Sequence, residues 1–424
     1  MEEAASTLLD KLYRLNDWYF GADKAAQISA LKSKVELLIS ANDYLSRGRL
    51  LNLDEGYNRE AEKYLTKAVK LAPTHFSGWN ALAMCLWKKG NKKVAFDCLS
   101  KSIQVRPNKE ALQDISILSR QVNSNMEDSV KYAGEALALD SEDHKSWCVE
   151  HTVYPYELPN SSTVYFRYVL GNALTSKYFT NSNDIHDLQL ALDAYSKAES
   201  LGGSVNPDMY YNRGMVLQYM LDYQGALLAY HAAFTIDPNL VETRMYFVNL
   251  NQYVHRLNQQ LSEQLVRLHN PAVLSRTLAS FASIGSLTTS LTTVRNLKPG
   301  DSNKSRTLAL KVLVDVVYST PPNNYICCDA EGRLVIVSFY NIGEGIRFFK
   351  ADNLLMVKGP ILFERAMWRD IGEWNSLRRD VPIVQVFDLR TVLVDGKTIP
   401  EEVIAPTVLK SIMIQQQQQE HDRL

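Results

Sequence analysis

The chain has 424 residues, with 46 lysines and arginines against 47 aspartates and glutamates, so its formal net charge is −1. This balance excludes attraction to nucleic acid or to an anionic membrane through overall charge. No apolar run approaches the ~20 residues that span a bilayer, and the five cysteines form no CxxC pair. We therefore expect a soluble protein with reduced thiols, located in the cytoplasm and also compatible with the nucleus.

Residues 1–41 are predicted to form helices. The opening sequence MEEAASTLLDKLYRLNDWYF alternates charged and apolar residues, whereas a secretory signal peptide has a continuous apolar centre. We expect these helices to cap the first of the repeats that follow.

Residues 42–268 follow a 34-residue period. The segments AEKYLTKAVKLAP (61–73) and AFDCLSKSIQVRP (95–107) superimpose at an offset of 34. Small residues such as Ala83 and Gly214 recur where two helices would cross closely, and prolines recur where a helix pair would end. This is the tetratricopeptide pattern, a repeated helix–turn–helix unit.

The pattern predicts a stack of five repeats closed by a long helix. Stacked helix pairs form a superhelix with a concave binding surface, which would be lined by the first helix of each pair. Binding of an extended peptide is therefore the expected activity. The predicted boundaries are 42–73, 74–107, 108–141, 142–206 and 207–238, followed by a capping helix at 240–268.

The fourth repeat is interrupted. Trp147 matches Trp79 of the second repeat, but the large apolar residue expected three residues later, and the small residue after it, appear 20 residues late, as Leu170 and Gly171. The intervening block 148–167, CVEHTVYPYELPNSSTVYFR, contains two prolines and no helical period. It is interpreted as an insertion, either a retained intron in the gene prediction or a lineage-specific loop, and no function is assigned to it.

The sequence changes character after residue 268. Residues 269–300 are rich in serine and threonine and are predicted to be a linker, whereas residues 301–400 contain β-rich runs separated by the turn sequences DAEG and VDG. Four or five strands predict a small closed barrel of OB type, with an SH3-like barrel or a sandwich as alternatives. Residues 401–424, with five consecutive glutamines, are predicted to be a disordered tail. The expected fold class is α+β multidomain, an all-α tetratricopeptide superhelix followed by this β-barrel.

Neither nucleic-acid binding nor catalysis is favoured. Residues 297–400 hold 14 lysines and arginines against 12 aspartates and glutamates, a net charge of +2, whereas binding of a single strand requires a basic groove with stacking aromatics. The aromatic residues of the barrel are assigned to its core and rim. The sequence has no P-loop, GxSxG, HExxH or zinc-ligand spacing, so we predict no enzyme, no cofactor and no metal.

Three charged residues occupy unusual places in the repeats. Arg120 stands where other repeats have leucine, and a buried arginine requires a carboxylate partner. Asp208 and Glu242 lie 34 residues apart at the second position of consecutive units, which would place both on the binding surface. The alternatives are a local pair of Arg120 with Glu127 or Asp128, and first-turn acids favoured only by the helix dipole. Together the three predict a peptide ligand with adjacent basic and acidic side chains.

The repeats and the barrel resemble the tetratricopeptide repeat protein 5 family. The likeness covers most of residues 10–400 apart from the block 148–167. It implies a non-enzymatic adaptor that binds the N-terminal Met-Arg-Glu of nascent tubulin at the ribosome and triggers decay of tubulin mRNA. A stress-responsive transcriptional co-activator is the alternative that the family implies. The matching segments are LTKAVKLAPTHFSGWNALAMCLWKKGN, SILSRQ, NPDMYYNRG, ALDAYSKAE, NLKPG and LVDGK.

The resemblance also implies roles for single residues. Arg120 would meet the glutamate of the peptide, and Asp208 and Glu242 its arginine, through charge-assisted hydrogen bonds. The family contacts ribosomal RNA with a lysine cluster after the capping helix; at this place the chain offers Arg267 and Arg276. The implied partners are nascent tubulin, the ribosome, and mRNA-decay or co-activator proteins, with no membrane and no sequence-specific nucleic acid.

Overall fold

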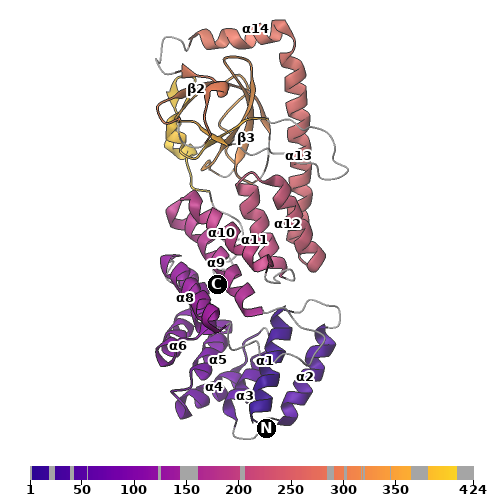
Figure 1. Ribbon diagram of the computed structural model, residues 1–424, viewed down its shortest axis with the longest axis vertical. Helices are drawn as coiled ribbons and strands as arrows, with labels where there is room; N and C mark the ends of the chain where they lie inside the picture. Colours follow the sequence, from indigo (N-terminus) through magenta and orange to yellow (C-terminus); the bar gives the residue numbers. More distant parts are fainter. Residues whose placement is uncertain are drawn as a thin grey trace. The chain divides into compact units, whose positions relative to one another are not determined.

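The computed structural model divides into two compact units (Figure 1). Unit 1 runs from Met1 to Arg213 and includes Thr235–Asn239, and unit 2 comprises Gly214–Phe234 and Leu240–Val408. In the part of the chain whose placement is described, no helix is both long and apolar enough to cross a membrane. The described residues are 2–18, 24–38, 43–54, 56–122, 126–143, 161–200, 206–283, 291–299, 303–316, 318, 320–343, 345–363 and 381–407.

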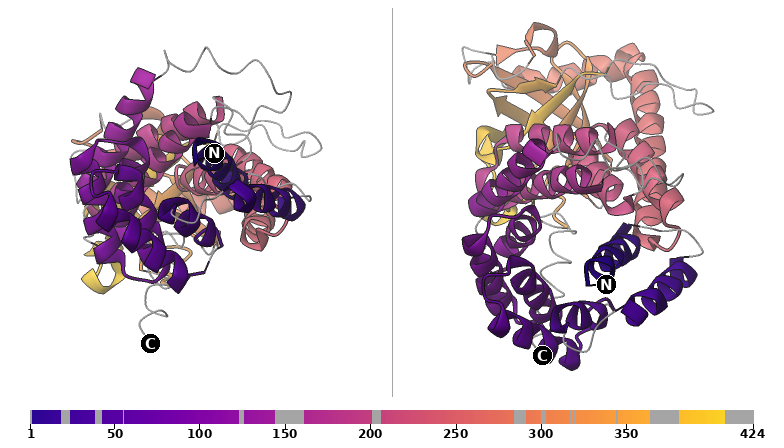
Figure 2. Two further views of the ribbon diagram at one scale, coloured as in Figure 1. Left: turned by 90° about the horizontal axis from the view of Figure 1, so that it is seen from below. Right: turned by 60° about the horizontal axis from the view of Figure 1, so that its bottom comes forward.

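Unit 1 is built from helices. From α3 to α10, each helix packs against the next one along the chain (Figures 1 and 2), as expected of stacked tetratricopeptide pairs. The helices are α1 Glu2–Trp18, α2 Lys24–Leu38, α3 Tyr44–Leu51, α4 Arg59–Leu71, α5 Phe76–Lys88, α6 Lys92–Val105, α7 Lys109–Val122, α8 Met126–Asp143, α9 Ser161–Lys177, α10 Ile185–Ala198, and the first half of α11 Pro207–Tyr219.

The helix α4 shows why the repeat sequence folds in this way. The side chain of Asn58 accepts hydrogen bonds from the backbone N–H groups of Glu60 and Ala61 and so caps the helix start. Ala61, Leu65 and Val69 recur every four residues and are buried in the core of the first repeats. The periodicity that identified the repeat is therefore the periodicity of its buried face.

Close helix crossings depend on glycine at two repeat positions. A Cβ atom on Gly171 would lie 2.4 Å from Tyr195 Cε1, and one on Gly214 would lie 2.6 Å from Tyr230 Cε1. Both tyrosines are fully buried in the second helix of the same pair. The small residues of the pattern thus make room for a large aromatic ring on the opposing helix.

Unit 2 combines helices with a curled sheet. Its helices are the second half of α11, α12 Tyr223–Ile236, α13 Val241–Leu268 and α14 Pro271–Ala279. The strands are β1 Leu291–Thr292, β2 Thr307–Val316, β3 Asn323–Asp329, β4 Leu334–Phe339, β5 Leu354–Lys358, β6 Ile361–Phe363, β7 Ile383–Val386, β8 Val392–Val394 and β9 Lys397–Thr398.

The sheet is mixed and forms a partly open barrel. Its strand order is β6-β7-β4-β3-β2-β5-β8-β9, with β1 attached to β2. The pairs β4–β7 and β1–β2 are parallel and the others are antiparallel. The antiparallel meander β2-β3-β4, with one later strand on each side, agrees with the OB type expected from the sequence. The described strands form an open path from β6 to β9, however, where the sequence led us to expect a closed barrel. The predicted fold class, tetratricopeptide helices followed by a small β domain, is confirmed.

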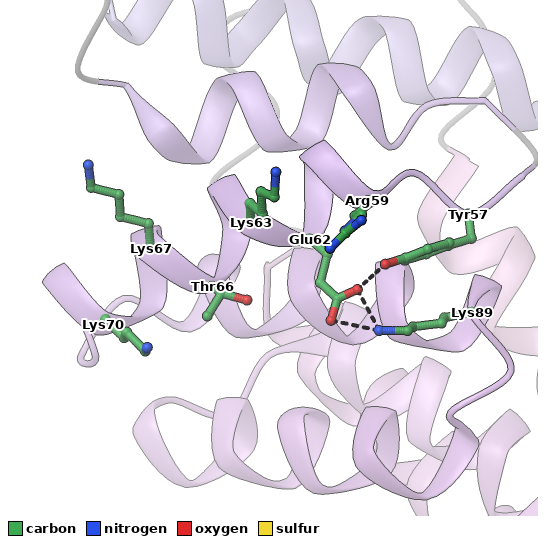
Figure 3. Close-up of a pocket in the computed structure, with 8 residues that line it drawn as sticks. All are labelled: Tyr57, Arg59, Glu62, Lys63, Thr66, Lys67, Lys70 and Lys89. Carbon is green, nitrogen blue, oxygen red and sulfur yellow. Dashed lines mark hydrogen bonds and ion pairs between the residues drawn. The ribbon is translucent and has the colours of Figure 1, made fainter.

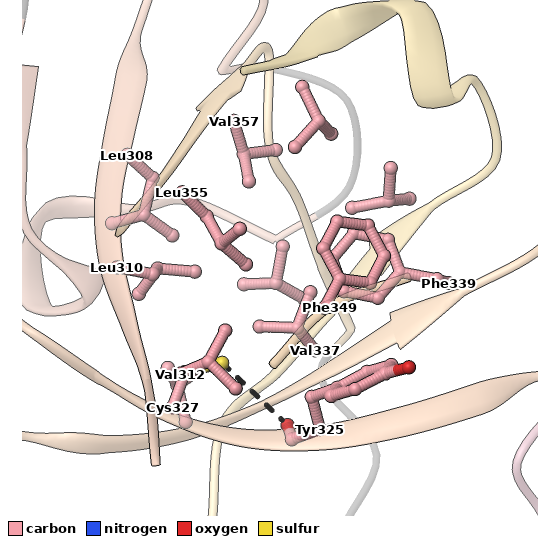
Figure 4. Packing of buried hydrophobic residues seen from close by; sticks show 14 of the residues in the cluster. Leu308, Leu310, Val312, Tyr325, Cys327, Val337, Phe339, Phe349, Leu355 and Val357 are labelled. Atoms are coloured by element: carbon pink, nitrogen blue, oxygen red, sulfur yellow. Dashed lines mark hydrogen bonds between the residues drawn. The ribbon is translucent and has the colours of Figure 1, made fainter. Parts of the chain in front are cut away.

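The interior of the barrel is filled by alternate residues of its strands (Figure 4). Leu308, Leu310 and Val312 of β2 point inward, because side chains one residue apart face opposite sides of a strand. The rings of Phe339 and Phe349 stack there at a centroid distance of 4.1 Å. Both rings are buried, so they are core residues and offer no platform for a base.

The segment predicted as a linker carries structure at both ends. It begins with α14, and near its end Val294 and Leu297 are buried in the core of the barrel. The barrel also extends past residue 400, because Val403 lies in the same core and Thr407 donates its backbone N–H to Asn341 Oδ1 at 3.0 Å. The local composition did not reveal this burial, because it depends on strands distant in sequence.

Two expectations fall largely outside the described residues. Of the block 148–167, residues 148–160 are not described, and residues 161–167 belong to the start of α9. The first helix of repeat four therefore begins nine residues before Leu170. The glutamine-rich tail from residue 408 onward also lies outside the described residues.

Helices and sheet of unit 2 share a hydrogen-bonded network that we call the buried seam: Tyr223, Tyr253, Asn324 and Ser338. Asn324 Nδ2 donates to the hydroxyls of Tyr223 at 2.8 Å and Tyr253 at 2.6 Å. Asn324 Oδ1 accepts from the Ser338 hydroxyl at 2.6 Å. All four side chains are buried, so α12 and α13 are joined to β3 and β4 without a solvent layer.

Candidate peptide-binding site

Arg120 lies in the last turn of α7, in unit 1, and is half-buried. One of its guanidinium nitrogens, Nη1, donates to the hydroxyl of Ser129 on α8 at 3.1 Å. Its positive charge also acts on the phenols of Tyr168 and Tyr195, whose pKa values it lowers against the larger effect of burial. The helix that carries Arg120, α7, packs against α9 as well as against its own partner α8.

A polar network, here called the amide ladder, connects three helices of unit 1 and consists of Tyr168, Asn172, Tyr195 and Asn212. The Tyr195 hydroxyl donates to Asn172 Oδ1 at 2.7 Å. Asn212 Nδ2 donates to the same Asn172 Oδ1 at 3.1 Å and to the Tyr168 hydroxyl at 3.4 Å. The two amides are half-buried, so the ladder is ordered by hydrogen bonds but still reached by water.

Asp208 stands in the first turn of α11 and its side chain is exposed. Within the described residues, no hydrogen bond or ion pair is assigned to its carboxylate. Partial removal of water by the surrounding protein raises the pKa of this carboxyl above its ordinary value, and the negative charge of Asp237 raises it further. The Asp208 charge in turn raises the pKa of Tyr168, which burial raises most. Arg120 and Asp208 thus both act on the same phenol, and a cation at Asp208 would relieve the unfavourable charge.

The other three predicted site residues belong to unit 2. Glu242 is exposed in the first turn of α13. Arg267 is exposed in the last turn of α13, and Arg276 is exposed on α14. The arrangement of the trio Arg120, Asp208 and Glu242 around one ligand remains a prediction, because only the first two lie in one compact unit.

The ladder residues were missed by the sequence reasoning. A signal for Asn212 existed, because it follows Asp208 by four residues in NPDMYYNRG and so shares its helix face. Tyr168 directly follows the block that was set aside as an insertion, which concealed it. Asn172 comes directly after Gly171, the residue that lets α9 approach Tyr195.

A second polar surface, the α4 basic surface, consists of Arg59, Lys63, Lys67, Lys70 and Lys89 (Figure 3). It surrounds an open hollow of about 480 Å³. The acid at its centre, Glu62, accepts from Lys89 Nζ at 3.0 and 2.8 Å and from the Tyr57 hydroxyl. These two partners lower the pKa of Glu62, so the acid stays ionised and holds Lys89 in place while the row along α4 remains cationic.

The barrel does not present its usual ligand face. OB barrels bind oligonucleotides on the face of their second and third strands, which correspond here to β3 and β4 of the meander. That face carries Asn324 and Ser338, which are buried in the seam with α12 and α13. The Tyr340 hydroxyl, directly after β4, donates to the backbone carbonyl of Tyr219 at 3.1 Å. The helices of unit 2 therefore occupy the place where a nucleic-acid strand would lie.

The described residues contain no group of three or more histidine, cysteine, aspartate or glutamate side chains arranged to hold a metal ion. The four described cysteines are buried. Burial raises the pKa of Cys98 to about 11, which keeps the thiol protonated and unreactive.

Comparisons with known proteins agree with this arrangement. The tetratricopeptide repeat model matches residues 44–75 and 76–109, the first two repeats. The chain is 26% identical to tetratricopeptide repeat protein 5 of Homo sapiens over 419 residues, covering 89% of this chain and 91% of that protein. It is 27% identical to the Mus musculus protein of the same name over 422 residues, with the same coverage.

Among solved structures, one chain with a similar fold is a Rap protein complexed with competence and sporulation factor. It has 15% identity and a TM-score of 0.39, and the match covers 65% of this chain and 79% of that one. The chain therefore carries tetratricopeptide repeats, an architecture suited to protein interaction, and is similar to tetratricopeptide repeat protein 5 along 89% of its length.

Proposed function

We propose that the chain is a non-enzymatic cytoplasmic adaptor that binds the N-terminal Met-Arg-Glu segment of nascent tubulin at the ribosome and triggers decay of tubulin mRNA. One observation carries the proposal. The exposed Asp208 carboxylate lies one helical turn before Asn212, which donates to the Tyr168 hydroxyl of α9, and α9 packs against α7, the helix that carries the opposite charge of Arg120. A short peptide with adjacent arginine and glutamate has the complementary charges.

The proposed contacts follow from charge. The guanidinium of the peptide arginine donates to Asp208, and Glu242 supplies a second carboxylate. Arg120 donates to the peptide glutamate while its other nitrogen keeps the Ser129 hydroxyl. A hydrogen bond to a charged group contributes about 1.5–3 kcal/mol, so two such contacts suffice to select one tubulin-like terminus over an uncharged one.

The proposed adaptor needs further surfaces for its other partners. The exposed Arg267 and Arg276 would contact phosphates of ribosomal RNA without reading sequence. The α4 basic surface fits an acidic segment of an mRNA-decay protein, because its cations line one open hollow. The two tyrosine rings nearest to it, Tyr44 and Tyr57, are covered by Lys67 and Lys89, which leaves no stacking platform for bases.

The test is fluorescence anisotropy of a labelled Met-Arg-Glu-Ile peptide with the full chain. We expect Asp208→Ala and Arg120→Ala each to weaken binding by roughly tenfold or more. The matched control is Asp193→Ala, which removes an exposed carboxylate from α10 of the same unit and should bind like the unaltered chain. The charge-exchanged peptide Met-Glu-Arg-Ile should bind weakly.

Two results would contradict the proposal. Absence of saturable binding by the unaltered chain would exclude the tubulin terminus as ligand and leave an adaptor of another specificity. Equal affinity of the unaltered chain and both variants would place the peptide elsewhere. Within the described residues no observation favours the transcriptional co-activator role over this one.

A further inference from the structure

Tyr57 is an accessible tyrosine in the link between α3 and α4. Its side chain is 37% exposed, whereas the other tyrosines whose exposure is described are buried or half-buried. The neighbouring Asp54 and Gly56 are also exposed and lie outside the helices, and nothing lies within 4 Å of a Cβ built on Gly56. A surface link of this kind can be reached by a second protein. Of the described tyrosines, Tyr57 is therefore the one most open to a modifying enzyme.

The hydroxyl of Tyr57 lies on the α4 basic surface (Figure 3). It donates to Glu62, and the same carboxylate accepts from Lys89 Nζ. The Lys89 ammonium also lies 5.1 Å from the centre of the Tyr57 ring. A group attached to the Tyr57 oxygen would therefore lie beside this ammonium.

Positive charge exceeds negative charge around this hydroxyl. Among the described residues that line the hollow, Glu62 is the one acid, and it faces the five cations of the α4 basic surface. Hydrogen bonds from Lys89 and Tyr57 lower the pKa of Glu62 most, and the charge of Arg59 lowers it further, so Arg59 acts at the same point. Within the described residues, no hydrogen bond or ion pair is assigned to Arg59 or Lys70. The hollow can therefore take up further negative charge.

A phosphate on the tyrosine has the charge that this surface lacks. Phosphotyrosine carries a charge of about −1.5 to −2 at pH 7 and three strong acceptor oxygens, and opposite a cluster of cations it forms about 1–3 charge-assisted hydrogen bonds. Lys89 can donate as a point charge and Arg59 through its planar fork. Glu62 would lose the hydroxyl that donates to it and would be repelled by the phosphate.

We propose that Tyr57 is a phosphorylation site, and that Lys89 and Arg59 hold its phosphate on the α4 basic surface. A protein tyrosine kinase would transfer the γ-phosphoryl group of ATP. The bond between the γ-phosphorus and the β–γ bridging oxygen breaks, a bond from phosphorus to Tyr57 Oη forms, ADP leaves, and the phenolic proton passes to a carboxylate of the kinase.

The modification would act as a switch. The captured phosphate neutralises part of the positive charge of the α4 basic surface, so that surface loses affinity for an acidic partner. This consequence rests on the proposed function, in which the surface binds an acidic segment. The capture of the phosphate does not.

The first test measures the charge around the phosphate. Phosphotyrosine is placed at position 57 of the full chain during translation, and phosphorus NMR follows its second pKa, which is ordinarily about 6. We expect this pKa to be about one unit lower than in the peptide 52–58 carrying the same group, because nearby cations favour the dianion. Lys89→Gln should raise it back toward the peptide value. The matched control is Lys101→Gln, an exposed lysine of α6 outside the hollow, which should leave it unchanged.

The second test measures access. A tyrosine kinase is chosen that phosphorylates the peptide 52–58, and the folded full chain is treated with the same kinase and ATP. We expect mass spectrometry to place the phosphate on Tyr57, and Tyr57→Phe to take up almost none.

A labelled hexaglutamate peptide then tests the switch. It should bind the unmodified chain, and bind the chain phosphorylated at position 57 about tenfold more weakly.

The outcomes are distinct. A phosphate that titrates in the folded chain as it does in the peptide overturns the inference, and so does a kinase that modifies the peptide but not Tyr57 of the folded chain. Equal binding of hexaglutamate to both forms overturns the switch. If hexaglutamate binds neither form while the phosphate pKa is lowered, the phosphorylation site stands and the proposed binding of an acidic partner at this surface is rejected.

Discussion

The two units contain networks of the same chemistry, tyrosine hydroxyls around asparagine amides, in opposite environments. In the buried seam, Asn324 is fully buried and its nitrogen and its oxygen are both hydrogen-bonded. In the amide ladder, Asn212 is half-buried, uses only its nitrogen, and stands one helical turn from an exposed carboxylate. A buried network in which every donor and acceptor is hydrogen-bonded holds two structural elements together. A partly exposed network with an acceptor that only water contacts can accept a hydrogen bond from a ligand.

The largest expected effect is on the seam. Asn324→Leu should lower the free energy of unfolding of unit 2 by about 2–4 kcal/mol, since two buried tyrosine hydroxyls and one serine hydroxyl each lose one hydrogen bond. Urea denaturation followed by tyrosine fluorescence measures the loss. Asn212→Ala, a change in the more hydrated network, should cost less than about 1 kcal/mol. Equal losses for the two variants would contradict the distinction between them.

The next effect connects packing to binding in the ladder. Gly171→Ala places a Cβ 2.4 Å from the Tyr195 ring, so we expect a loss of about 1–3 kcal/mol in the free energy of unfolding. The displaced ring would also shift Asn172 and weaken peptide binding. The comparison variant is Gly134→Ala, where nothing lies within 4 Å of the new Cβ. An unchanged melting temperature in Gly171→Ala would show that α9 and α10 are not closely packed where Gly171 faces Tyr195.

A smaller effect concerns pH. The pKa of the Asp208 carboxyl is raised, and a bound guanidinium would lower it, so affinity should fall on acidification, starting at a pH above the ordinary aspartate value of about 3.8. Anisotropy titrations from about pH 7 to about pH 4 with Met-Arg-Gln-Ile, which lacks the titrating glutamate, measure this. Asp208→Asn should bind this peptide weakly, and its affinity should not change with pH in this range.

The sign for stability is the reverse of that for binding. Because the folded-state pKa of Asp208 is raised, its ionised form disfavours folding, and the unligated chain should gain stability relative to Asp208→Asn as the pH falls through the raised value. If the affinity of Asp208→Asn for the peptide changed with pH as steeply as that of the unaltered chain, the pH dependence of binding would belong to another group.

The smallest effect is expected at the α4 basic surface. Glu62→Gln removes the partner of Lys89 in an ion pair near the surface, and such pairs contribute about 1 kcal/mol at most. The folded-state pKa of Glu62 is lowered, so its contribution is present at neutral pH and is lost as the pH falls through that lowered value. Thermal melts at low and high salt measure it. A loss comparable to that of Asn324→Leu would contradict the separation of surface and buried polar groups.

Several features could be predicted because they are local in the sequence. The buried face of α4, with Ala61, Leu65 and Val69, follows from residue spacing alone, as does the need for a small residue at Gly171. The inward row Leu308, Leu310 and Val312 follows from strand alternation in the same way. By contrast, Val294 and Leu297 lie in a serine- and threonine-rich segment whose composition indicates a linker. Their burial comes from strands that follow later in the chain.

The sequence by itself determined the 34-residue period, the change to β structure after it, and the charged residues Arg120 and Asp208 as departures from the pattern. The sequence could not distinguish the roles of Asn212 and Asn324, because both have the same side chain and differ only in their surroundings. Only the tertiary structure decided that Asn324 is enclosed by Tyr223 and Tyr253, 101 and 71 residues away, while Asn212 keeps an acceptor in water. Burial and the number of satisfied hydrogen bonds depend on partners distant in sequence, and they set the role of a polar residue.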